Sequence, residues 1–308
     1  LTLGTIYTPG TALPTGNLNL GNATVTLNAG TTVTVGNGKS LITSGTVNAN
    51  TTAAITGGTW TIDGGTVDLF AMDGSTITAN TSVTDPAILT NTFSGIFPAS
   101  NASNFTVANG GTVTIPSGYT LKVNNTGTFT VDAGGVIADA DDTGTLIFAK
   151  NGTVTNNGSL TVNSIQADAG VGNTVTYAGS GTNSGALAVV TGTLTLRADF
   201  SVSSATIAVG ATLNTTSSYV LSVSGTLTNN GTLAADPRIT YNGAVEQTLL
   251  NFIGYLNLTI NNAAGVVASG LSSILNTLSL VLGQLSGAAA NITLGAGATI
   301  SRSGGSID

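Results

Sequence analysis

The chain has 308 residues, with no Cys, no His, 42 Gly and only 6% charged residues, and its net charge is −7 with a pI near 4.1. Without His or Cys there is no imidazole base, thiol nucleophile, disulfide framework or zinc site of the usual kind. Six Lys and Arg cannot build the basic surface that nucleic acid requires, and no run approaches the roughly 18 apolar residues of a membrane span, so neither partner is expected.

Residues 1–15 are expected to form an extended N-terminal segment. Leu1 to Leu3 already follow a strand pattern, and an extended stretch continues to Pro14. A free strand of this kind could add to the sheet of a neighbouring molecule, as in donor-strand complementation. The chain begins at Leu1 without Met, which we interpret as processing of a secreted protein; the alternative is that it is a piece of a longer chain.

Residues 16–308 carry apolar residues at every second position in many short segments. This period of two predicts strands of about 3 to 5 residues with one buried and one solvated face. The segments, in chain order, are 18–20, 25–27, 33–35, 60–62, 67–69, 113–115, 121–123, 129–131, 160–162, 194–196 and 256–258. Asn-Gly pairs separate several of them, and their glycines are expected to adopt positive φ. Only residues 271–285 have spacing that could suit a helix, and their Leu-Ser-Leu-Val-Leu run favours a strand.

The segments resemble one another, and 152–158 and 225–231 are near copies. Self-similar short strands favour an all-β fold in which rungs stack, so we predict a parallel β-solenoid. We expect a single right-handed β-helix over residues 16–308, with about three short strands per rung. Residues 84–104 interrupt the alternation and are interpreted as an insertion, and a more aliphatic part begins at about residue 236.

The stretches 239–249 and 255–265, with Asn-Leu-Thr-Ile-Asn-Asn at 257–262, resemble the repeat unit of very large secreted prokaryotic β-solenoid surface proteins. The unit Gly-Asn-Leu-Asn-Leu-Gly at 16–21 is similar to another motif of that group. The resemblance implies an extracellular, cell-surface location and an adhesin-like or filament-forming role. It transfers no active site.

Neither end carries an amphipathic segment that would cap a solenoid. Uncapped ends favour head-to-tail stacking, a contact that does not close and therefore makes a fibre. The residues expected at this subunit interface are Leu1, Leu3, Ile6, Tyr7, Ile292, Leu294 and Ile300.

The densest group of carboxylates is Asp139, Asp141 and Asp142. One interpretation is a calcium site, since calcium takes several oxygen ligands. The other is a solvated turn, because the Gly-Gly-x-Gly-x-Asp pattern of calcium-loaded solenoids does not occur. We expect no other cofactor.

Some β-helices degrade pectin, but that chemistry needs an acid and a base at a set separation, together with His and basic partners that this chain lacks. We therefore expect no enzyme.

Three further surface features have alternative interpretations. Trp60, Phe70, Phe93, Phe97 and Phe105 could stack on sugars or could pack in the interior. Thr-x-Thr strands, as at 24–26 and 59–61, are typical of ice-binding solenoids, but their irregular spacing in the sequence argues against a flat threonine array. Asn-x-Ser/Thr sequons, the acceptors of N-glycosylation, occur at Asn22, Asn50, Asn80, Asn101, Asn104, Asn214 and Asn291.

The sequence therefore predicts an extracellular structural protein, a subunit that self-assembles into a homopolymeric filament or surface layer by strand addition and solenoid stacking. The alternative from another class is an adhesin stalk or passenger that binds glycans or surfaces through its Thr and Asn face. A polysaccharide-active β-helix enzyme is the third.

Overall fold

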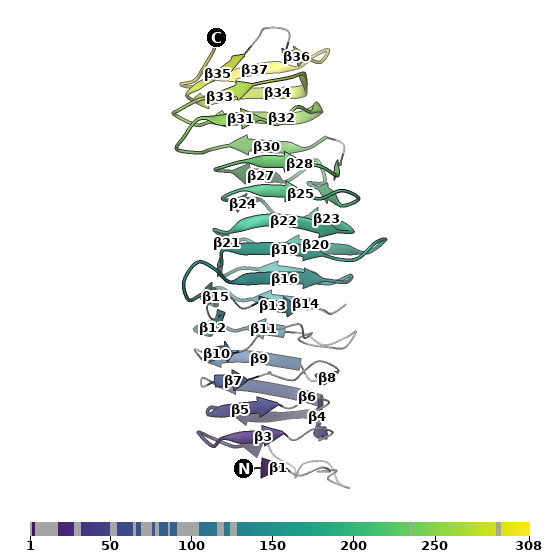
Figure 1. Cartoon of the computed structure of the whole chain (residues 1–308), viewed down its shortest axis with the longest axis vertical. Coiled ribbons are helices and arrows are strands. Elements are labelled where there is room, and N and C mark those ends of the chain that lie inside the picture. The colour runs from purple at the N-terminus through teal and green to yellow at the C-terminus, as the bar shows by residue number, and fades with distance from the viewer. Residues whose placement is uncertain are drawn as a thin grey trace. The chain divides into compact units, whose positions relative to one another are not determined.

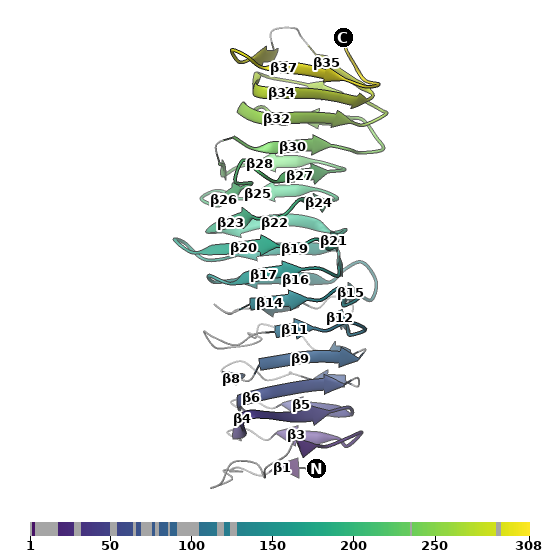
Figure 2. The ribbon, with the colours of Figure 1, turned by 180° about the vertical axis from the view of Figure 1, so that it is seen from behind.

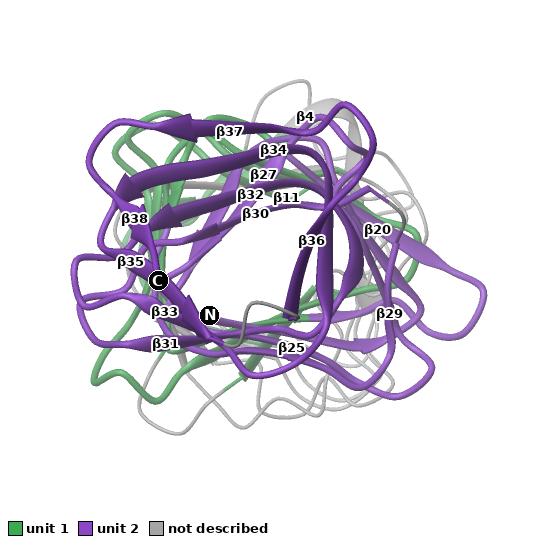
Figure 3. Ribbon diagram, turned by 90° about the horizontal axis from the view of Figure 1, so that it is seen from above, with its two compact units in different colours: residues 1–166, 179–182 green, residues 167–178, 183–308 purple. Residues whose placement is uncertain are grey.

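The computed structural model describes residues 2–3, 18–27, 32–49, 54–63, 66–68, 76–77, 80–85, 87–90, 105–115, 120–123, 128–234, 236–287 and 291–308. These residues form two compact units, coloured separately in Figure 3: residues 1–166 with 179–182, and residues 167–178 with 183–308. Both units are all-β, and the described residues contain no α-helix. Their strands pair in parallel from rung to rung, so the predicted parallel β-solenoid is confirmed.

Three parallel sheets make up unit 1. The first contains β1 (Thr2–Leu3), β3 (Val25–Leu27), β5 (Thr46–Ala49), β7 (Thr66–Asp68), β10 (Ala87–Thr90), β12 (Thr112–Ile115), β15 (Val136–Asp139) and β18 (Ser159–Thr161). The second contains β2 (Leu18–Asn19), β4 (Thr32–Thr43), β6 (Ala54–Asp63), β9 (Asn80–Asp85), β11 (Phe105–Val107), β14 (Thr128–Val131) and β17 (Thr153–Asn156), with β8 (Thr76–Ile77) beside β6. The third contains β13 (Thr120–Val123) and β16 (Thr145–Ala149).

The strands of unit 2 fall into four sheets. The first sheet has β20 (Thr174–Ala178), β23 (Thr193–Leu196), β26 (Thr212–Asn214) and β29 (Thr232–Leu233). The second sheet has β22 (Ala186–Thr191), β25 (Ala205–Ile207) and β28 (Leu227–Asn229). The third sheet has β24 (Phe200–Val202), β27 (Val220–Val223), β30 (Arg238–Tyr241), β32 (Ile253–Asn261) and β34 (Ser272–Leu282), with β36 (Ile292–Leu294) and β37 (Thr299–Arg302) both on β34. The fourth has β31 (Gln247–Leu249), β33 (Val266–Ala268), β35 (Gln284–Gly287) and β38 (Ser306–Ile307). Two strands, β19 (Ser164–Asp168) and β21 (Thr182–Asn183), contain residues of both units.

The interior of each unit is built from columns of inward side chains. In unit 2 one column descends from Ile300 through Leu278, Leu258, Ile239 and Leu221, each paired in register with the next. Figure 1 shows the strands that carry this column, β27, β30, β32 and β34, one above another. In unit 1, Phe105 stacks on Phe129 at 5.2 Å between ring centroids. Because side chains alternate across a strand, the period of two in the sequence produces these columns.

Rungs differ in length along the chain. In unit 1, Phe105 pairs with Phe129, which in turn pairs with Val154. A shorter stretch of chain completes the rung from Leu41 to Trp60 in the same unit and the rung from Thr174 to Thr193 in unit 2. Three strands per rung are seen from β11 to β31, as predicted. From β30 onward, β32 and β34 are long strands that each cover two stretches of a rung, with register shifts along their pairing.

Two segments for which the sequence left another interpretation open contain strands. Of the predicted insertion 84–104, residues 87–90 belong to β10, which pairs in register with its neighbours, and residues 84–85 belong to the end of β9, where the pairing with β6 shifts its register at Asp85. Residues 86 and 91–104 lie outside the described residues. Residues 272–282, whose spacing could have suited a helix, form β34.

The glycines of the Asn-Gly pairs serve two different purposes, one of which was expected. Of the Asn-Gly glycines, Gly110 adopts positive φ, but Gly158 and Gly231 do not. At both positions a Cβ atom would collide with backbone carbonyl oxygens of the preceding rung. These two glycines are therefore needed because consecutive rungs approach closely, and only a residue without a side chain fits there.

The second sheet of unit 1 aligns hydroxyl-bearing residues at five successive rungs. Thr61, Ser82, Thr106, Thr130 and Thr155 pair in register, although unequal lengths of chain separate them. Irregular spacing in the sequence therefore does not prevent alignment of hydroxyl-bearing residues in one column, because parallel pairing keeps the strands in register. The expectation that it prevents a flat threonine array stays a prediction.

Candidate assembly surface

The rung formed by β36, β37 and β38 has sheet partners on one side only among the described residues. β36 and β37 pair with β34, and β38 pairs with β35. Backbone hydrogen bonds hold this rung to the preceding one. The Ser306 N–H donates to the Gly283 carbonyl at 2.9 Å, and the Gly295 N–H donates to the Ile274 carbonyl at 2.8 Å. The opposite edges of the three strands present backbone groups suited to another parallel strand.

The inward side chains of this rung are apolar and partly exposed. Ile300 lies in register with Leu278, which is fully buried, but Ile300 itself is 49% exposed. Ile307 is 51% exposed, whereas its partner Leu285 is 1% exposed. The positions are equivalent, so the difference in exposure arises because none of the described residues covers the interior of this rung.

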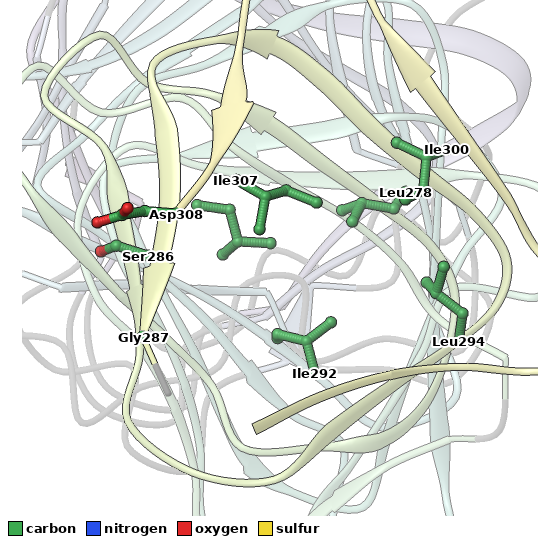
Figure 4. Close-up of a pocket in the computed structure, with 9 residues that line it drawn as sticks. Leu278, Ser286, Gly287, Ile292, Leu294, Ile300, Ile307 and Asp308 are labelled. Carbon is green, nitrogen blue, oxygen red and sulfur yellow. The ribbon is translucent and has the colours of Figure 1, made fainter. Parts of the chain in front are cut away.

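These side chains surround an open apolar cavity of about 210 Å³. Figure 4 shows Leu278, Ile292, Leu294, Ile300 and Ile307 pointing toward a common space. The cavity continues the stacked interior of the preceding rungs. A further rung of inward Leu, Ile or Val residues would remove its apolar lining from water.

Three of the predicted interface residues, Ile292, Leu294 and Ile300, line this cavity together. Ile307 and Leu285 also line the cavity but could not be predicted from the sequence, because each is the one large apolar residue of a short strand. At the other end, Leu3 lies in β1 and pairs with Leu27 of the same chain. Leu1, Ile6 and Tyr7 lie outside the described residues, as does the rest of the predicted donor strand beyond residue 3.

The acidic group near Asp139 is built as a turn. One carboxylate oxygen of Asp139 accepts hydrogen bonds from the backbone N–H groups of Gly144 and Asn163, at 2.9 and 2.8 Å. Asp141 accepts a hydrogen bond from the Thr143 hydroxyl, and Asp142 has positive φ. Over the described ranges, no three acidic side chains are grouped so that they could hold a metal ion.

The aromatic residues that could have formed a sugar-stacking platform are buried wherever the structure describes them. Trp60 and Phe105 are fully buried, and the indole N–H of Trp60 donates to the Thr43 hydroxyl at 3.0 Å, so neither ring can stack on a sugar. The interior-packing interpretation holds for these two. Phe70, Phe93 and Phe97 lie outside the described residues.

The sequons occupy different local environments. Asn22 is exposed in a turn. Asn214 and Asn291 are half-buried and their side-chain amides are engaged: Asn214 accepts from the Thr216 N–H, and Asn291 donates to the Ala268 carbonyl. Asn80 lies in β9, and Asn50, Asn101 and Asn104 are outside the described residues.

A buried polar cluster in unit 2 was not foreseen from the sequence. Gln247 donates to the carbonyls of Val223 and Gly225 and accepts from Asn262, whose side chain is fully buried. Nearby, the hydroxyl of Tyr241 accepts from the Leu250 N–H, and the hydroxyl of Tyr255 donates to the Leu250 carbonyl.

Burial controls the titration of these two tyrosines. Desolvation raises the pKa of Tyr241 above its ordinary value. Desolvation also raises the pKa of Tyr255, and the neighbouring Tyr241 raises it further. Both phenols are therefore held neutral, in keeping with a structural rather than a chemical role.

No known protein family, curated protein or solved structure matches this chain. Across the described ranges, no helix has the length and apolar character needed to cross a bilayer. The fold and the open rung are therefore the observations on which a function must be argued.

Proposed function

We propose that this chain is an extracellular structural subunit that self-associates end to end into a filament or surface layer. The observation that carries the proposal is the contrast between equivalent interior positions, buried in one rung and half exposed in the next, as for Leu278 and Ile300. A second copy that supplies a rung of parallel strands would cover these side chains and pair the open strand edges at once.

The driving force is the one that stacks rungs within the chain. Burial of apolar area stabilises a contact by about 25 cal/mol per Å² before the cost of association is subtracted. A head-to-tail contact is heterologous and leaves the same two kinds of surface free on the product, so it propagates. The low charge of the chain, 6% of residues, reduces repulsion between stacked copies.

The proposal is tested by electron microscopy and sedimentation of the purified chain over a range of concentrations. We expect filaments from the natural sequence and monomers from Ile300→Asp, which places a carboxylate at the junction. Val209→Asp is the matched control, because Val209 is 84% exposed in a turn away from the open rung. Circular dichroism verifies that both variants keep the fold.

Monomers of the natural chain at every concentration would overturn the proposal. Filaments that survive Ile300→Asp would also overturn it as argued, because assembly would then use another surface.

A further inference from the structure

The second candidate surface is independent of the open rung and lies on the flank of unit 2. The outward positions of β20, β23, β26 and β29 form two columns, which we call the threonine face. One column consists of Thr174, Thr193, Thr212 and Thr232, and the other consists of Thr176, Thr195 and Asn214. Figure 2 shows β20, β23 and β26 one above another.

Burial establishes that these side chains point outward. In β20 and β23 the threonines are half-buried and alternate with buried residues, Val175 and Tyr177 in β20 and Leu194 and Leu196 in β23. Rungs of a parallel sheet are about 4.8 Å apart, and alternate positions along a strand are separated by about 6.6 Å. The face is therefore periodic in two directions.

The chemistry of the face is uniform. All of its positions carry a hydroxyl or an amide, and none carries a charge. Threonine is β-branched and therefore stiff at χ1, so each hydroxyl and methyl group is held in a narrow range of positions before any ligand arrives. A preorganised array loses little conformational entropy on binding.

Single hydroxyl columns also occur in the second sheet of unit 1 and in the sheet of β27 and β30, but in unit 2 the columns of the other sheets are less uniform when taken in adjacent pairs. In the sheet of β22, β25 and β28, Ala188 precedes Thr206 and Thr228. In the sheet of β27 and β30, the column beside the hydroxyls contains Val220 and Arg238. The threonine face differs from these two sheets because both of its adjacent columns are free of alkyl and charged side chains.

We propose that the threonine face binds ice. A regular, uncharged grid of hydroxyl and methyl groups matches a solid whose hydrogen-bonding oxygen atoms repeat in two directions on a similar scale. On such a face the hydroxyls bond to lattice water and the methyl groups fit between lattice positions. Water-mediated hydrogen bonds of this kind are nearly as favourable as direct ones. Single polysaccharide chains are a different class of ligand, and they are usually held by aromatic stacking, which this face does not offer.

The test measures how much of the full-length chain is incorporated into a slowly growing ice hemisphere, together with thermal hysteresis and the shape of single ice crystals. We expect enrichment in ice and faceted crystals for the natural chain. The double variant T176K/T195K places two charges on adjacent rungs of the threonine face, and we expect a several-fold loss of incorporation. The matched control A188K/T206K places two charges on adjacent rungs of another face, and incorporation should be unchanged.

Two results would overturn the proposal. One is a natural chain that is excluded from ice and leaves crystals unshaped. The other is retention on insoluble cellulose or chitin that T176K/T195K abolishes while ice is unaffected, which would assign the face to glycans. Circular dichroism of both double variants excludes loss of fold as the cause.

Discussion

The two units solve the same packing problem with different side chains. In unit 1 aromatic rings pack around Phe129: Phe105 stacks on it, and Phe148 meets it edge-on at 5.1 Å between centroids. The buried polar side chains of this unit, Thr43 and Asn156, are hydrogen-bonded. In unit 2 the interior near Tyr255 contains a larger cluster of hydroxyls and amides with hydrogen-bond partners. A solenoid interior therefore tolerates polar groups that find partners, as general rules for buried polar groups require.

The largest expected effect is on the apolar interior of unit 1. Phe129→Ala should lower the free energy of unfolding by about 3–5 kcal/mol, through lost burial and the cavity left behind. The single tryptophan, Trp60, is buried in unit 1, so its fluorescence during urea unfolding reports on this unit. The control Thr130→Ala, on the outward side of the same strand, should change stability by no more than about 1 kcal/mol. Equal effects from both variants would contradict the columns described here.

In the polar interior of unit 2, removal of one side chain should lower stability because it leaves hydrogen-bonding groups without partners. Asn262→Leu leaves the Val245 carbonyl and the Ala264 N–H without their side-chain partner, and we expect a loss of about 1–3 kcal/mol. The matched control is Asn276→Leu, which removes an amide–amide hydrogen bond to Asn257 of 2.8 Å at the surface. Circular dichroism during urea unfolding measures both, and a larger effect at Asn276 would contradict the proposed importance of burial.

The tyrosines of unit 2 predict a loss of stability at high pH. Their pKa values are raised in the folded chain above the ordinary value of about 10, so folding favours the protonated phenols. The resulting stability is fully present below about pH 10 and is lost as the pH rises toward the folded values, because the unfolded chain then releases protons that the folded chain retains. Melting temperatures between pH 8 and pH 12 should fall less steeply for the double variant Y241F/Y255F. An unchanged slope would show that other groups control the transition.

The smallest effect is expected at the Asp139 turn. Asp139→Ala removes an acceptor from two backbone N–H groups and should cost about 1 kcal/mol. Asp142→Asn should be close to neutral, because that side chain is exposed and asparagine also tolerates positive φ. Calcium and EDTA should leave the melting temperature of the natural chain unchanged. A clear rise with calcium that Asp142→Asn abolishes would support the calcium interpretation.

The alternation in the sequence located most strands but not every inward residue. Val113 and Ile115, and likewise Phe129 and Val131, are buried as their pattern predicted. In β32 the pattern placed Leu256 beside Leu258 on the inward side, but Leu256 is half-buried and Tyr255 is buried instead. The reason is a register shift between Tyr255 and Asn257, which reverses the face of the strand and leaves no mark in the apolar pattern.

The near-copied segments illustrate a second limit. Residues 152–158 and 225–231 form similar turns, in which Asn156 and Asn229 each accept a hydrogen bond from the N–H of the glycine that follows shortly after, Gly158 and Gly231. Yet the first follows β17 and the second follows β28, which belong to different sheets. Local similarity therefore predicted the turn but not the face on which it lies.

The two candidate surfaces also differ in how far the sequence could predict them. Ile292, Leu294 and Ile300 could be named from the sequence because apolar residues continue in strand pattern to that point. The threonine face could not, because neighbouring members of each column lie a whole rung apart in the chain and only the pairing of the strands shows that they are aligned. The hydroxyl column of unit 1 was hidden for the same reason.

By itself, the sequence determined the class of fold, the short strands and the inward side of most of them, because a period of two and β-branched residues act locally. Only the tertiary structure decided the register between rungs, the partners of Gln247 and Asn262, and the grouping of threonines on one face. These depend on how much of the chain lies between one strand and the strand that pairs with it in the next rung, and a pattern that acts locally does not specify that length.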